Sequence, residues 1–166
     1  DLTVQTVNLD ATDTTTEVAL TTPLIRVFRM KVMSDVVLAA DVSAVASGGA
    51  TTYATVQAGN NQTLMAIYTV PAGYTAYMTN YYYSVTNLTN KSPTSTDFRL
   101  WAADRANGYN FQLKHMVGVS QNASGDQHMF NPPVKFNQKT DIKLTSLCAD
   151  QGGAVQGGFD LVLISN

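Results

Sequence analysis

Charged side chains are scarce in this chain. Asp, Glu, Lys and Arg make up 13% of its 166 residues, which is about half of the share in an ordinary globular protein. The net charge is −2, the sequence pI is about 5.5, and Lys and Arg form no cluster along the chain. Proteins that bind nucleic acid gather basic residues in a patch or stripe, so we expect no nucleic-acid partner.

The chain is equally poor in residues for acid–base chemistry. Glu17 is its one glutamate, and its two histidines, His115 and His128, lie 13 residues apart. Catalysis needs an acid, a base or a nucleophile placed together, and no Gly-x-Ser-x-Gly motif marks a nucleophile elbow. We therefore expect that the chain is not an enzyme, with no catalytic residue and no cofactor. For His115 we expect a half-buried ring with one hydrogen bond.

Metal-ligand patterns are also missing. Asp126 and His128 place two ligand-type side chains on one face of a predicted strand, but no third ligand accompanies them. Asp10 and Asp13 lack the ligand spacing and the glycine of a calcium-binding loop. The sequence therefore predicts no metal site.

The single cysteine, Cys148, excludes an internal disulfide and a cysteine-based zinc cluster. Leu144 and Leu147 precede it in a strand-like run, so we expect a buried thiol. A lone cysteine also suits a chain that assembles in a reducing cytosol. No apolar run reaches the roughly 18 residues of a membrane-spanning helix, and we expect no membrane partner.

Helical periodicity is nearly absent, and residues 34–47 (SDVVLAADVSAVAS) fit an extended segment as well as a short helix; we interpret them as extended. Elsewhere, short runs rich in Thr, Val, Ile and Tyr alternate with turn residues every 8 to 12 positions or so. This spacing predicts an all-β fold, an antiparallel and jelly-roll-like β-sandwich of about eight to ten strands. The main runs are 2–7, 24–33, 51–58, 63–70, 74–85, 97–102, 109–119, 141–148 and 159–164.

Two tight turns join pairs of these runs. Pro71-Ala72-Gly73 combines a fixed φ with a residue that tolerates positive φ, and it predicts a hairpin between 63–70 and 74–85. Asn107-Gly108 predicts a second hairpin between 97–102 and 109–119. Asn131-Pro132-Pro133 is expected to separate short strands at 127–130 and 134–136.

A tyrosine run, Tyr81-Tyr82-Tyr83, is the strongest candidate for an interface or binding site. Strict alternation predicts two faces for this strand: Tyr77, Tyr81, Tyr83 and Val85 on one, and Ala76, Met78, Asn80 and Tyr82 on the other. Tyr82 therefore points away from its two neighbours. Aromatic rings pack in cores, fill subunit interfaces and stack on sugars, and the sequence leaves these three interpretations open.

Residues 151–158 contain two Gly-Gly pairs between predicted strands. A phosphate-binding loop lies between a strand and a helix, so these glycines predict a flexible hairpin loop instead. No stretch has the composition of a disordered linker. We therefore expect a single β-sandwich domain over residues 23–166, preceded by an extended N-terminal arm or first strand over residues 1–22 that pairs with a neighbouring molecule.

Three segments resemble proteins of tailed-bacteriophage virions, notably from phages of marine bacteria. They are QTLMAIYTVPAGYTAYMTNYYYSV (62–85), KFNQKTDIKLTS (135–146) and GGFDLVLISN (157–166). Their order and spacing are similar to those of the family, and the resemblance covers residues 57–166. The opening third is similar only through RVFRMKVMS (26–34), and Tyr74 stands where the family commonly has lysine.

The resemblance implies a structural role in the virion and supplies no functional residues. The first expectation is a capsid decoration or cement protein on the capsid surface, a homotrimer that contacts the major capsid protein. The alternative is a receptor-binding domain of a tail fibre or spike that holds a host glycan with loops 86–96 and 120–125. A secreted carbohydrate-binding or hydrolytic domain is a third option, and the scarcity of Glu and His disfavours its enzymatic form.

Overall fold

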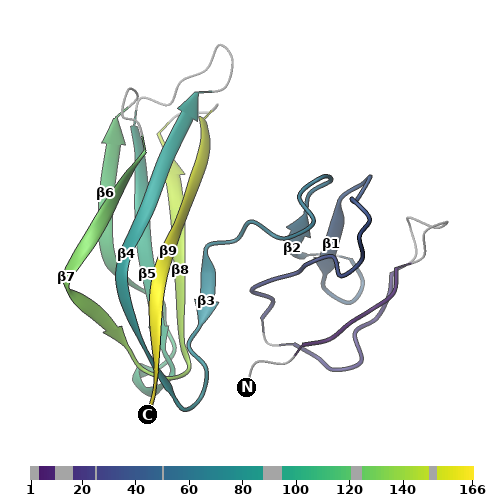
Figure 1. Ribbon diagram of the computed structural model, residues 1–166, viewed down its shortest axis with the longest axis horizontal. Helices are drawn as coiled ribbons and strands as arrows, with labels where there is room; N and C mark the ends of the chain where they lie inside the picture. The colour runs from purple at the N-terminus through teal and green to yellow at the C-terminus, as the bar shows by residue number, and fades with distance from the viewer. Residues whose placement is uncertain are drawn as a thin grey trace. The chain divides into compact units, whose positions relative to one another are not determined.

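The computed structural model describes residues 4–9, 17–24, 26–49, 51–87, 95–120, 125–149 and 153–166. The chain divides into two compact units, Asp1–Thr63 and Leu64–Asn166. The described residues form nine β-strands and one 3-10 turn, η1 (Arg105–Asn107), without an α-helix (Figure 1). The predicted all-β class is confirmed.

The first unit contains one antiparallel pair, β1 (Val42–Val45) and β2 (Thr52–Val56). The expectation that residues 34–47 are extended is confirmed where β1 lies. The predicted strand at 24–33 is wrong for its described residues, because only Lys31 forms an isolated bridge, with Gln62. Residues 4–9 also belong to no strand, and residues 1–3 of the predicted first strand lie outside the described part.

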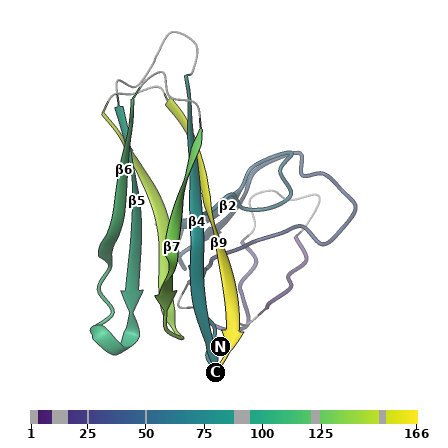
Figure 2. The ribbon, with the colours of Figure 1, turned by 60° about the vertical axis from the view of Figure 1, so that its left-hand side comes forward.

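The second unit is a sandwich of two antiparallel sheets (Figure 2). The order β3-β8-β5-β6 forms one sheet, and the order β7-β4-β9 forms the other. The pairing is nested, as in a jelly roll: β4 pairs with β9, and these strands enclose the pair β5 and β8. The bounds are β3 (Ile67–Thr69), β4 (Tyr74–Asn87), β5 (Ser95–Asp104), β6 (Gln112–Ser120), β7 (Asp126–Phe136), β8 (Thr140–Cys148) and β9 (Gly153–Ser165).

One hydrophobic core fills the space between these sheets. Leu100 and Ile142 from the first sheet are completely buried, as are Met78 and Tyr81 from the second. Partly buried side chains such as Leu161 pack against this cluster. The expected sandwich therefore exists, but it spans residues 64–166, and residues 23–63 fall in the first unit instead of a single 23–166 domain. No change of composition marks this boundary in the sequence.

The predicted hairpin at Pro71-Ala72-Gly73 is wrong in its pairing. The turn itself forms, because the Tyr74 amide donates to the Pro71 carbonyl at 3.3 Å and Gly73 has a φ of 80°. However, β3 pairs with β8 and β4 lies in the opposite sheet. The same turn can join two strands of one sheet or two strands of different sheets. It therefore predicts that the chain reverses direction, but it does not predict which strand pairs with β3. The hairpin at Asn107-Gly108, between β5 and β6, is confirmed.

A bulge in β4 overturns the expected division of its faces. The register with β9 shifts between Met78 and Asn80, so Thr79 has no partner residue. A one-residue insertion exchanges the faces of all side chains beyond it. Met78 consequently faces the core together with Tyr81 and Tyr83, although strict alternation placed it on the opposite face.

Two expected breaks are absent. Strand β7 continues through Asn131-Pro132-Pro133 with an irregular register against β4, and an edge strand tolerates proline because its outer N–H groups need no partner. Strand β9 begins at Gly153, so the predicted loop 151–158 is strand in its described part. Its residues pair with the long β4 as far as Asn87. The loop prediction was wrong here because it was based on the two Gly-Gly pairs, which are also compatible with a strand.

Candidate interaction site

The tyrosine run is divided between the core and the surface. Tyr81 and Tyr83 are buried, and the Tyr83 ring lies 5.1 Å from that of Phe98, centroid to centroid. Tyr82 is 50% exposed on the outer face of the β7-β4-β9 sheet. Tyr81 and Tyr83 are therefore core residues, and Tyr82 alone is left as a surface candidate from this run.

The ring of Tyr82 lies across Gly158, its partner on β9. A Cβ atom added at Gly158 would come within 2.3 Å of the Tyr82 Oη and 2.5 Å of its Cζ. The glycine thus leaves space for the ring, and the ring covers a glycine that would otherwise expose its backbone. Part of the Tyr82 surface therefore contributes to sheet stability.

This contact predicts energetic coupling between Tyr82 and Gly158. Tyr82→Ala is expected to lower the free energy of unfolding by up to about 1 kcal/mol, as for other cross-strand aromatic pairs. In a Gly158→Ala background the ring is already displaced, so the same change should cost much less. Urea unfolding of the four proteins of this double-mutant cycle measures the coupling. An equal cost of Tyr82→Ala in both backgrounds would contradict the contact.

Two histidines meet where the edges of the two sheets face each other. His115 on β6 and His128 on β7 stack with ring centroids 4.0 Å apart and an interplanar angle of 25°. His115 Nδ1 forms a 2.7 Å hydrogen bond with the Tyr81 hydroxyl, and both histidines are partly buried. The expected state of His115 is confirmed. The stacking was not predicted, because nothing local indicates that two histidines 13 residues apart become neighbours across the sandwich.

Burial controls the electrostatics of this cluster. Burial, followed by the neighbouring His128, lowers the pKa of His115 below its ordinary value. Burial also raises the pKa of Tyr81 to about 12, with a smaller contribution from Tyr83. The pKa of Tyr83 is raised by burial and then by the negative charge of Asp126. The cluster therefore favours a neutral imidazole and a protonated phenol at neutral pH.

The lowered pKa of His115 predicts that acid destabilises the fold. The unfolded histidine takes up a proton near pH 6.5, whereas the folded ring resists protonation, so the unfolded state binds more protons as the pH falls. The stability is expected to be full above pH 6.5 and to decrease below it. Urea midpoints between pH 7.5 and 5.5 measure this slope, which the Tyr81→Phe/His115→Phe double variant should reduce. A stability that rises toward pH 5.5 would contradict it.

Among the described residues, no group of three or more His, Cys, Asp and Glu side chains lies close enough together to hold a metal ion. Asp126 and His128 both lie on β7, but no third ligand joins them in the described part of the chain. Asp10 and Asp13 lie outside it.

The outer edge of β8 is paired with another strand over only part of its length. Strand β3 pairs with only three β8 residues, Asp141 to Lys143. Figure 1 shows β3 as a strand much shorter than β8. The Leu144 amide extends this contact by donating to the Ala66 carbonyl at 2.9 Å. Beyond Leu144, β8 continues to Cys148 and pairs with β5 on its other side, but no described strand pairs with it on the β3 side. Within the described part of the chain, the first sheet therefore has an open edge over residues 145–148.

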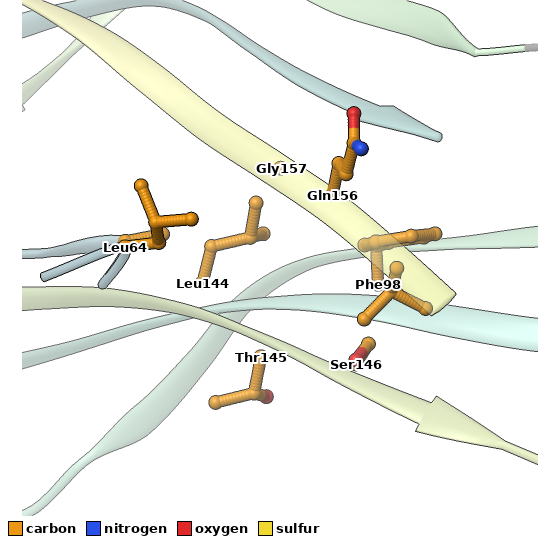
Figure 3. Close-up of a pocket in the computed structure, with 9 residues that line it drawn as sticks. Leu64, Phe98, Leu144, Thr145, Ser146, Gln156 and Gly157 are labelled. Carbon is orange, nitrogen blue, oxygen red and sulfur yellow. The ribbon is translucent and has the colours of Figure 1, made fainter. Parts of the chain in front are cut away.

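A groove lies beside this open edge, between β8 and β9. Figure 3 shows Leu64 and Leu144 next to each other, with Gly157 of β9 passing over Leu144. A Cβ atom at Gly157 would lie only 3.0 Å from Leu144 Cδ2, so the glycine keeps the groove open. None of the lining residues is charged, and the apolar part is formed by Leu64, Ala66, Phe98, Leu144, Val155 and Gly157.

Cys148 lies at the end of this open edge. Its side chain is partly buried and accepts a hydrogen bond from the Thr96 hydroxyl at 3.4 Å. The expectation of a buried thiol is wrong, because the side chain is only partly buried where β8 extends past the part of the sandwich that β3 covers. The sequence signal, apolar neighbours on a strand, could not distinguish a covered edge from an open one.

A row of apolar side chains crosses the outer face of the β7-β4-β9 sheet. Met129 of β7 is 67% exposed, and Val162 and Ile164 of β9 are each 52% exposed. The register places Met129 opposite Asn80, Val162 opposite Tyr77 and Ile164 opposite Thr75, so all three share the outer face with Tyr82. Exposed apolar side chains that share one face of a sheet can form a contact with another macromolecule.

The chain matches no protein-family model, and no curated protein or solved structure was found to match it. In the described part of the chain, no helix has the length and apolar character needed to cross a membrane.

Proposed function

We propose that this chain is a structural protein of a tailed-bacteriophage virion, with a decoration or cement role on the capsid. In this role it contacts the major capsid protein and stabilises the shell through repeated contacts between subunits. The three segments that resemble phage virion proteins support the phage assignment. The chain works by binding and does not catalyse a reaction.

The open edge of β8 is the observation that carries the assembly role. Edge strands in monomeric proteins are normally covered, charged or shortened, because free N–H and C=O groups recruit other strands. Here the edge runs beside an uncharged groove, and the opposite sheet presents the apolar row of Met129, Val162 and Ile164. A subunit of a symmetric shell can bury such surfaces against its neighbours, because stable assemblies bury about 2,000 Å² or more of surface.

Immunogold electron microscopy tests this location. An antibody raised against the full chain is applied to purified particles of the phage that encodes it, and labelled heads are expected. A pre-immune serum provides the control. Label confined to tails contradicts the decoration role, and particles without any label contradict the virion role. Light scattering of the isolated chain tests the expected homotrimer, which a strictly monomeric mass would contradict.

The exposed ring of Tyr82 supports a second candidate, a receptor-binding domain of a tail fibre or spike. A half-exposed aromatic ring offers a face on which a sugar can stack. A glycan array then shows binding that Tyr82→Ala abolishes and that Tyr74→Ala, at another exposed tyrosine of β4, leaves unchanged. A flat array contradicts this candidate.

A further inference from the structure

We infer that the open edge of β8 accepts the N-terminal segment Val4–Leu9 of a second copy of this chain as an added β-strand. The inference rests on the proposed structural role, since it names how copies of the chain join each other. In this arrangement β8 is the acceptor edge, the groove beside it receives side chains of the added strand, and Val4–Leu9 is the donor segment.

The acceptor edge has its hydrogen-bonding groups in place. The Leu144 amide and the Thr140 carbonyl both point toward β3, and β8 pairs with β5 without a register shift. Residues two apart on an antiparallel strand point their backbone groups to the same side. The backbone N–H and C=O groups of Ser146 and Cys148 therefore point to the open edge. A strand added there continues the row that β3 begins.

The groove provides places for the side chains of an added strand. Even-numbered residues of β8 face the core, as the complete burial of Ile142 shows, and the exposed Ser146 continues this face into the groove. Every second side chain of an added strand would point between the sheets, onto Leu144, Val155 and the bare backbone of Gly157. An uncharged lining favours a donor segment without charges.

Val4–Leu9 has the properties that this acceptor requires. Its sequence, VQTVNL, contains no charge and no proline, and it belongs to no strand. Val4 is 89% exposed and Leu9 is 51% exposed, so their apolar surface lacks cover. Six extended residues span about 20 Å, enough to follow the edge from Leu144 to Cys148.

The segment is held weakly in its own unit. Gln5 bonds to Thr21 and to the Thr22 backbone, and all of these hydrogen bonds are exposed to solvent. Exposed bonds of this kind exchange readily with water. Release of the segment therefore leaves the β-ladder of the sandwich intact, and in an assembled shell neighbouring copies of the chain supply such strands.

The native Cys148 allows a direct test by disulfide trapping in the full chain. Single cysteines are introduced at each position from Val4→Cys to Leu9→Cys, and the proteins are oxidised and separated without reductant. A disulfide forms only when the two Cα atoms lie within about 7 Å. Covalent dimers are expected at only one or two of the six positions, those that lie opposite Cys148 in the added strand, because the other positions are too far along the strand. They should disappear when Cys148→Ser is added.

Three results would overturn the inference. These are the absence of covalent dimers, equal yields at all six positions, and a disulfide within one chain, which would assign the groove to the chain's own segment. Ser146→Pro removes an edge-facing N–H and should lower the dimer yield about tenfold, whereas Ser146→Ala keeps that N–H and should not. The Trp101 fluorescence of both variants checks that they fold.

The two proposals fail in distinguishable ways. Label on phage heads without trapped dimers overturns strand addition and leaves the virion role intact. Trapped dimers without label on any particle overturn the virion role and leave strand addition intact.

Discussion

Leu100→Ala is expected to lower the free energy of unfolding of the sandwich by about 2–5 kcal/mol. Leu100 is completely buried in β5, between strands β6 and β8 of its sheet. Truncation removes apolar contacts and leaves a cavity that the surrounding strands can fill only in part. Trp101, the single tryptophan of the chain, lies in the same strand and reports on unfolding of this unit in urea.

The matched control for this change is Leu113→Ala on the neighbouring strand β6. Leu113 is 46% exposed, so the same truncation should cost less than about 1 kcal/mol. Equal losses for Leu100→Ala and Leu113→Ala would contradict the placement of the core between the two sheets.

Asp141→Ala is expected to cost about 3 kcal/mol or more. The Asp141 side chain lies in β8, is 2% exposed, and accepts hydrogen bonds from the hydroxyls of Thr69 and Tyr109. Hydrogen bonds to charged groups contribute about 1.5–3 kcal/mol each, and truncation leaves both hydroxyls without this acceptor. Because Thr69 belongs to β3, the change should also loosen the short strand that borders the open edge.

Asp160→Ala provides the control, since it removes the same side chain from an exposed position on β9. Thermal unfolding of the three proteins is measured under one set of conditions. A Tm of Asp141→Ala equal to that of Asp160→Ala would contradict the structural role of the buried carboxylate.

The sequence predicted the strands of the sandwich far better than it predicted their partners. Alternation and turn residues are local signals, and they located β4, β5, β6 and β8 closely. The partner of β3 depends on contacts with residues 141–143, more than 70 positions away, which the Pro71-Ala72-Gly73 turn cannot indicate. The hairpin at Asn107-Gly108 succeeded because its two strands are paired neighbours both in sequence and in space.

A single bulge explains why the tyrosine faces were mispredicted. The period-two pattern of β4 is regular up to Met78 and regular again from Asn80, but the phase changes at Thr79. Nothing in the composition around Thr79 marks an inserted residue. The interpretation of Tyr82 as opposite to Tyr81 and Tyr83 survived, because all three lie on the same side of the bulge.

The candidate site was the least predictable part of the molecule. The groove depends on the shortness of β3, on the length of β8 and on Gly157, which are properties of the packed sheets. The sequence did suggest an N-terminal arm that pairs with a neighbour, from its alternating apolar residues. It contained no signal for the acceptor edge, which exists only because one strand ends before its partner does.

A cryo-electron microscopy map of the particle, with this chain traced in it, tests the central claim most directly. The proposal predicts the β-sandwich of residues 64–166 on the outer surface of the head, in contact with more than one major capsid subunit. A map in which this chain occupies only the tail, or in which the head surface carries no such sandwich, would contradict it.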